Sequence, residues 1–183
     1  LPELVDTKAR LQTLLREDNG DVATYELVAG VADDAYDAIT NQTRFPNSSD
    51  ELRHGTDEAI LHLAQVAEDY LAVIQPLLEV LAVCGAWGRQ THERTWKRAM
   101  ERIAQSNTTH TGQVALLELR WVPLVAAAYT IGVAGVWNEN YGPVRAALVD
   151  AEVRDLRAGR IPICYRTDPW RPQSSRCARR GHR

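Results

Sequence analysis

ILHLAQVAEDYLAVIQPLLEVLAVC, residues 60–84, carries the clearest periodic pattern in the chain. Its apolar positions alternate spacings of three and four without a slip, which is typical of one buried face of an α-helix. The positions of this stripe are Ile60, Leu63, Ala67, Tyr70, Ile74, Leu77, Leu81 and Cys84. From Val73 onward the segment is apolar on most sides, so we expect this half at the centre of the fold. Pro76 predicts a kink rather than an end, because the stripe continues beyond it.

Weaker stripes predict five further helices, and the fold class that follows is an all-α bundle of about six helices. The first of them runs from Pro2 to the Asn19-Gly20 stop, and the others cover residues 21–44, 91–105, 113–137 and 144–158. In the second helix the expected buried positions are 22, 25, 29, 32, 36, 39 and 43, which again alternate spacings of three and four.

The C-terminal end differs in composition from the helical part. Ile161–Tyr165 is the one segment that resembles a strand, and it has no evident partner. The residues from 166 to 183 hold six arginines against Asp168 alone. We therefore divide the chain into a helical bundle domain over 1–158 and an extended or disordered basic tail over 159–183. Such a tail could attract nucleic acid, although no motif supports that partner.

Composition bounds the class of protein. With 183 residues, 45% of them hydrophobic, the chain is long enough for a sizeable core. Three widely spaced cysteines form no disulfide framework, which predicts a cytoplasmic protein. Three Asn-x-Ser/Thr triplets, at Asn41, Asn47 and Asn107, would be acceptors for N-glycosylation only if the chain were secreted. The Leu start predicts a fragment of a multidomain protein, and the Ala-rich texture is similar to helical regions of large bacterial proteins.

Charge is distributed unevenly along the sequence. Residues 1–70 carry 15 Asp or Glu and 5 Lys or Arg, whereas residues 71–183 carry 9 and 16. Two interpretations stay open: the two halves face each other within one fold, or one half meets a polar partner.

An acidic triplet in the second helix is a candidate metal site. Asp33, Asp34 and Asp37 fit the pattern D-D-x-x-D, in which the first and last carboxylates lie one turn apart. The triplet resembles the first metal motif of the isoprenoid synthases, which are all-helical, and this resemblance of five residues implies Mg²⁺ ions that hold a diphosphate. No second motif accompanies it, and an acidic solvated helix face explains the triplet equally well.

A second candidate metal site lies at the start of the long helix. His54, Glu58 and His62 recur every four residues, and Glu51 precedes His54 with the Glu-x-x-His spacing of di-iron bundles. A di-iron centre needs two such motifs, and one is present. A helical contact between Glu58 and His62 on the surface is the alternative.

A basic stripe on the fourth helix is a candidate site for an anionic partner. Arg94, Arg98 and Arg102 lie on one side of the helix, and Lys97 lies beside them. The alternative is that the acidic second helix neutralises this stripe within the fold.

Residues 121–137 form an uncharged run with Trp at both ends and an Ala128-x-x-x-Gly132 spacing. Such a run is compatible with a short membrane-spanning helix or with a central helix of a globular bundle, whose small residues let neighbours approach closely. Its abundance of Ala and Gly favours the globular alternative, in which this helix and the long third helix lie at the bundle's centre.

No nucleophile motif and no phosphate-binding glycine loop occurs in the sequence, so we expect no cofactor. The expected function is that of a non-catalytic helical interaction or regulatory module. Its partner would be another protein, a neighbouring domain of the same chain, or a second copy. A metal-dependent enzyme of helical-bundle type and a segment attached to a membrane through residues 121–137 are the alternatives.

Overall fold

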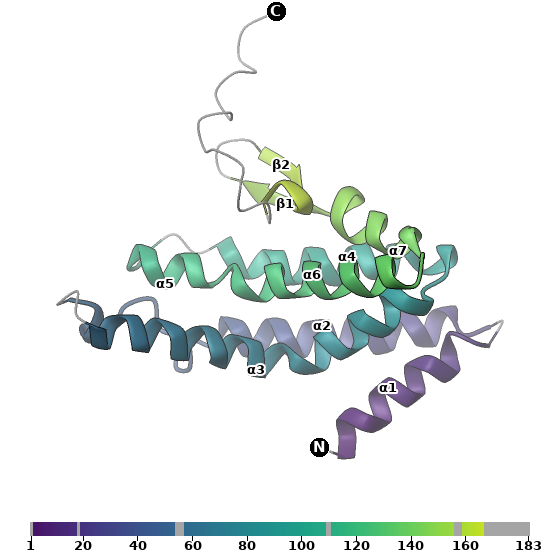
Figure 1. The fold of residues 1–183 in the computed structure, drawn as a ribbon, viewed down its shortest axis with the longest axis horizontal. Helices are drawn as coiled ribbons and strands as arrows, with labels where there is room; N and C mark the ends of the chain where they lie inside the picture. Colours follow the sequence, from purple (N-terminus) through teal and green to yellow (C-terminus); the bar gives the residue numbers. More distant parts are fainter. Residues whose placement is uncertain (1, 18, 54–56, 109–110, 156–158, 167–183) are drawn as a thin grey trace, which may run out of the picture.

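Four helices form the central bundle of the computed structural model, which describes all residues except 1, 18, 54–56, 109–110, 156–158 and 167–183. They are α2 (Asp21–Thr40), α3 (Asp57–Trp87), α4 (Glu93–Ala104) and α6 (Val122–Trp137). Figure 1 shows α3 and α6 side by side, with α2 and α4 behind them. The all-α bundle of about six helices expected from the sequence is confirmed.

The four helices occupy the corners of a bundle, in which α2 packs against α3 and α4, and α6 packs against the same two. The helices of two neighbouring pairs run parallel. Gly85 and Gly135, near the C-terminal ends of α3 and α6, lie together, and the starts of α2 and α4 meet through Asp21 and His92. The link between α3 and α4 therefore crosses the end of the bundle diagonally, through the short helix η2 (Gln90–His92).

The core confirms α3 as the central helix, and its most extensive contact is with α6. The predicted stripe is buried from Tyr70 to Cys84, and α3 continues without interruption through Pro76. The prediction was wrong for the first part of the stripe, since Ile60 is exposed and Leu63 and Ala67 are only half-buried. This end of α3 extends past the helices that cover the rest of it (Figure 1).

The buried face of α2 agrees with the predicted one at Ala32 and Ile39 and differs from it elsewhere. Its buried residues are Thr24, Val28, Ala32, Ala35 and Ile39. The predicted positions Val22 and Tyr25 are exposed. α2 packs against both α3 and α4, and its buried side faces these two helices. The predicted stripe lies at the edge of this side, along the seam with α4.

The predicted helix over 113–137 is two helices in the structure, α5 (Val114–Leu119) and α6, separated by a turn at Arg120 and Trp121. Pro123 lies in the first turn of α6, where its missing N–H costs no hydrogen bond, so it starts a helix rather than kinking one. At the other end of the chain, α1 (Pro2–Leu14) packs against α2 and α3. Two further short 3₁₀ helices, η1 (Asp50–Arg53) and η3 (Gln105–Thr108), lie in the connections.

The predicted sixth helix over 144–158 was wrong beyond residue 150. α7 (Tyr141–Arg145) continues into a π-helical turn, Ala146–Asp150, and the chain then forms β1 (Glu152–Asp155). β1 pairs antiparallel with β2 (Gly159–Pro162), with Val153 opposite Ile161, so the strand-like segment does have a partner. The short helix α8 (Ile163–Arg166) follows. Residues 159–166, which the sequence assigned to the tail, thus have regular structure, and Ile163 is fully buried. Residues 167–183 lie outside the described part.

Candidate functional site

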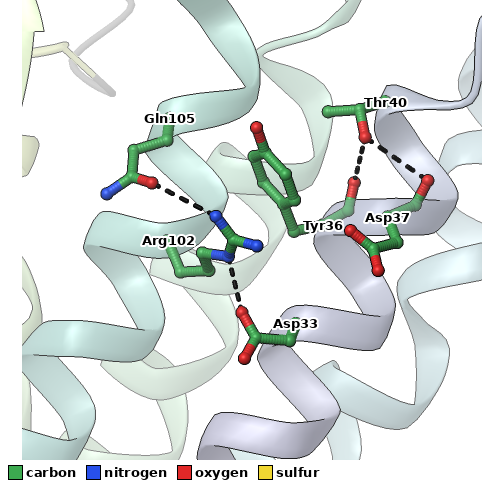
Figure 2. A network of polar contacts seen from close by, with 6 residues as sticks. All are labelled: Asp33, Tyr36, Asp37, Thr40, Arg102 and Gln105. Carbon is green, nitrogen blue, oxygen red and sulfur yellow. Dashed lines mark hydrogen bonds and ion pairs between the residues drawn. The ribbon is translucent and has the colours of Figure 1, made fainter.

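The seam between α2 and α4 joins the acidic and basic parts of the sequence. Arg102 Nε donates to Asp33 Oδ1 at 2.6 Å, and the guanidinium carbon lies 3.6 Å from the centroid of the Tyr36 ring. Figure 2 shows the side chain of Arg102 reaching from α4 to both partners, with Gln105 on its far side. Tyr36 lies one turn from Asp33 on α2, so the helix period brings both onto the face that Arg102 meets.

This pairing bears directly on the D-D-x-x-D triplet. Asp33 is already bound to Arg102, and Asp34 and Asp37 are exposed to solvent. The carboxylate of Asp37 is drawn apart from that of Asp33 in Figure 2, where only the backbone oxygen of Asp37 accepts a hydrogen bond, from Thr40. The first carboxylate of the triplet, that of Asp33, therefore neutralises the side chain of Arg102 within the same chain.

The second predicted metal site is equally incomplete. Glu58 is exposed and His62 half-buried on α3, and His54 lies outside the described residues. Across the described part of the chain, no group of three or more His, Cys, Asp or Glu side chains is placed to hold a metal ion.

A pocket of about 340 Å³ opens along the seam and includes Asp33 and Arg102 in its lining. From α2 come Tyr25, Ala29, Ala32 and Asp33, and from α4 and the start of η3 come Thr95, Arg98, Ala99, Glu101, Arg102 and Gln105. The floor is made by the buried alanines Ala32 and Ala99. Polar groups surround this floor.

The four predicted anion-binding residues have different surroundings. Arg102 is bound to Asp33, and Lys97 Nζ lies 3.8 Å from Glu101 Oε1 within α4. Arg94 is exposed and does not border the pocket, whereas Arg98 does. The sequence left open whether the acidic α2 neutralises this basic stripe. The structure shows that it does so for Arg102.

A buried histidine fixes the start of the same seam. His92 is 2% exposed, and its Nε2 lies 2.8 Å from Asp21 Oδ1 at the first turn of α2. A carboxylate can only accept a hydrogen bond, so Nε2 of His92 is the donor to Asp21. The ring also meets Trp96 edge to face, with 5.6 Å between ring centroids. This contact joins the N-terminal ends of α2 and α4.

Sequence reasoning missed a buried arginine at the junction of α5 and α6. Arg120 is 6% exposed and donates to the side-chain oxygen of Asn47. Burial raises the pKa of Tyr70, and the neighbouring Arg120 partly offsets this. Tyr70 in turn stacks on Phe45 with ring centroids 3.9 Å apart. No local pattern predicts this cluster, because its members come from three segments distant in sequence.

The outward side of α6 is apolar and uncovered by described residues. We call its four exposed side chains the α6 outer face: Tyr129, Val133, Val136 and Trp137, with exposed fractions of 59%, 65%, 58% and 86%. By length and composition, Asp57–Trp87 and Val114–Trp137 could each cross a membrane, a test that buried core helices also pass. The opposite side of α6 is core, with Leu124, Ala127 and Ile131 fully buried.

Comparison with protein-family models, with curated proteins and with solved structures finds no match for this chain.

Proposed function

We propose that this chain is a non-catalytic helical interaction module and that a protein partner binds the α6 outer face. The observation that carries the proposal is the exposure of two aromatic and two aliphatic side chains along one side of a single helix. Contiguous apolar surface of this kind is typical of contact surfaces. Tyr and Trp are also the residues that contribute most to binding free energy at protein interfaces.

The spacing of the α6 outer face fits a helical partner. Positions 129, 133 and 136 follow the i, i+4, i+7 pattern by which a helix presents anchors to an apolar groove or to another helix. Because the other side of α6 is locked in the core, the face is rigid before a partner arrives. Binding would then cost little ordering entropy.

A photo-crosslinking experiment tests the location of this contact. Benzoylphenylalanine replaces Val133 in the full chain, and the matched control carries it at Gly30, which is exposed on α2 with open space around its Cα. We expect a single protein adduct from position 133 alone, identified by mass spectrometry. Binding of that purified partner should weaken by about tenfold or more with Val133→Glu, since the change places a charge in an apolar contact.

Leu61→Glu is the control substitution, because Leu61 is an exposed apolar residue of α3 outside the α6 outer face. It should leave the affinity unchanged. Equal adducts from positions 30 and 133, or no adduct at all, would contradict the proposal. So would binding of the chain to phosphatidylcholine liposomes that Val133→Glu abolishes, because the face would then contact lipid.

A further inference from the structure

The helix that carries the α6 outer face has no charge. From Val122 to Trp137 the sequence holds no Asp, Glu, Lys, Arg or His. A partner that covers the face therefore needs an uncharged, largely apolar surface of its own, because an opposing charge would lose its water without gaining a partner. The same face on a second copy of the chain is such a surface.

The anchors of the α6 outer face are arranged symmetrically about its centre. Tyr129 lies four residues before Val133 and Trp137 lies four residues after it. Positions four apart lie on the same side of a helix. When two such helices cross antiparallel at Val133, positions equally far before and after it lie opposite each other. Tyr129 of each copy then meets Trp137 of the other, which is the self-complementarity that a two-fold dimer requires.

Small residues between these anchors leave room for the second helix. A Cβ on Gly132 would meet a single atom within 4 Å, the Cδ1 carbon of Leu148 at 3.9 Å. In the antiparallel arrangement Val136 lies opposite Thr130, since each is three residues from the centre. The Thr130 hydroxyl already donates to the Ala126 carbonyl oxygen at 2.8 Å. Covering it therefore leaves no hydrogen-bond donor without an acceptor.

The exposed area of the face matches a weak dimer. A fully exposed aromatic side chain presents about 150–250 Å², so Tyr129 and Trp137, 59% and 86% exposed, present about 300 Å² together. The two valines of the face, 65% and 58% exposed, add roughly 100–150 Å². With the half-buried residues along both edges of α6, two copies would bury about 1,000 Å², the size of a weak and reversible interface.

We propose that the α6 outer face binds the same face of a second copy of this chain, with the two α6 helices antiparallel and crossing at Val133. This inference rests on the proposed function and names its partner. Pairing with a different apolar surface of the chain, such as the exposed Ile60 and Leu61 of α3, would not close on itself and would build open chains of copies. Two-fold pairing covers both faces and stops at the dimer.

Sedimentation velocity of the purified full chain over a range of concentrations tests for this dimer. We expect a reversible equilibrium between monomer and dimer with a Kd on the order of 10 μM, as an interface of this size allows. Val133→Glu places two carboxylates face to face at the crossing point and should raise the Kd at least about a hundredfold. Leu61→Glu adds the same charge at an exposed apolar position of α3 and should leave the Kd unchanged.

Two double variants test the antiparallel direction. In an antiparallel dimer, Tyr129→Lys/Trp137→Glu sets opposite charges against each other at both ends of the contact, whereas Tyr129→Glu/Trp137→Glu sets like charges there. The first variant should dimerise at least about tenfold more tightly than the second at low ionic strength. A parallel dimer would oppose like charges in both variants, so both would dimerise equally weakly. Because both positions are exposed, the circular dichroism spectra should match that of the parent chain.

The proposal is overturned if the chain stays monomeric at roughly 100 μM, ten times the expected Kd, or if assemblies larger than dimers form. It is also overturned if Val133→Glu dimerises as tightly as the parent chain, or if the two double variants dimerise equally. A monomeric chain that still forms a single adduct with a different protein from position 133 would exclude the second copy and keep the proposed contact surface. A monomeric chain without any adduct would overturn both.

Discussion

At the scale of single residues, the feature that most needs explanation is a buried cation. Arg120 has no carboxylate partner among the described residues. It donates instead to the amide oxygen of Asn47, and it also interacts with the side chain of Tyr70. A guanidinium has five donors in a planar fork, so it can connect two such acceptors at once. Arg120 therefore ties the loop after α2 to α3 and to the start of α6.

Replacing Arg120 by Met should lower the free energy of unfolding by about 2 kcal/mol, because Asn47 and Tyr70 lose a hydrogen-bond donor in a buried setting. Urea denaturation followed by circular dichroism measures the change. Arg94→Met, at an exposed site on α4, is the control and should stay within about 0.5 kcal/mol of the parent chain. An equally stable Arg120→Met variant would show that relief from burying a charge outweighs the lost bonds.

At the scale of elements, two close contacts of α3 and α6 depend on glycines that the sequence did not single out. A Cβ on Gly85 of α3 would lie 2.7 Å from the Ile131 carbonyl oxygen of α6. Gly135 of α6 serves a different contact, because a Cβ there would lie 2.9 Å from the carbonyl oxygen of Asn140, in the link to α7, whereas the nearest α3 atom, the Gly85 carbonyl oxygen, would be 3.6 Å away. Gly132, the glycine of the predicted Ala-x-x-x-Gly motif, has only a Leu148 methyl carbon at 3.9 Å. The helices therefore approach one turn later than that motif predicts.

Alanine substitutions test this assignment directly. Gly85→Ala and Gly135→Ala should each destabilise the fold by about 2–3 kcal/mol, because backbone atoms would have to move. Gly132→Ala should instead be neutral or stabilising by up to about 1 kcal/mol, since alanine is the better helix former. Gly30→Ala, at an open position in α2, should behave like Gly132→Ala. Chemical denaturation of the four variants checks the pattern, and equal losses at positions 85 and 132 would refute it.

At the scale of the whole molecule, the two oppositely charged parts of the chain meet inside one bundle. α2 carries acidic residues to the basic α4, and the contacts of Asp21 with His92 and of Asp33 with Arg102 join them. Asp21 and Asp33 are each more than half exposed, so the attraction in these pairs adds little stability. The apolar core around α3 supplies most of the stabilisation.

Alkaline pH should destabilise the whole bundle through two buried acids of α3. Burial raises the pKa of the Cys84 thiol well above 9.0, and burial raises that of Tyr70 above 10.0 despite the nearby Arg120. The folded state therefore keeps protons that the unfolded state releases, so this stability is complete below the unfolded pKa values and is lost as pH rises through the folded ones.

Each group should contribute a loss of about 1.4 kcal/mol per pH unit within its window. Urea unfolding at about pH 8 and about pH 10.5 measures the slope. The double variant Cys84→Ala/Tyr70→Phe has no such groups, so its stability should fall less steeply. Identical slopes for the parent and the double variant would contradict the prediction.

Periodicity predicted the buried face of α3 from Tyr70 onward, because one long stripe has one buried side. For α2, which packs against two neighbouring helices, it found the buried Ala32 and Ile39 but not Thr24, Val28 and Ala35. The helical pattern also wrongly extended the last helix into the segment that forms β1. In β1 the exposed Glu152 and the buried Val153 alternate as in a strand, and this strand forms because β2 lies opposite. Of the candidate site, the sequence predicted Arg98 and Arg102 but not Thr95, Tyr25 or the alanine floor.

Spacing and composition within single segments were enough to predict the all-α class, the central position of α3 and the opposite charges of α2 and α4. The packing of the helices was needed to show that α2 and α4 run parallel, that Arg102 is neutralised by Asp33, and that the α6 outer face has no cover among the described residues. These properties depend on which segments distant in sequence lie together, and helical periodicity carries no information about that choice.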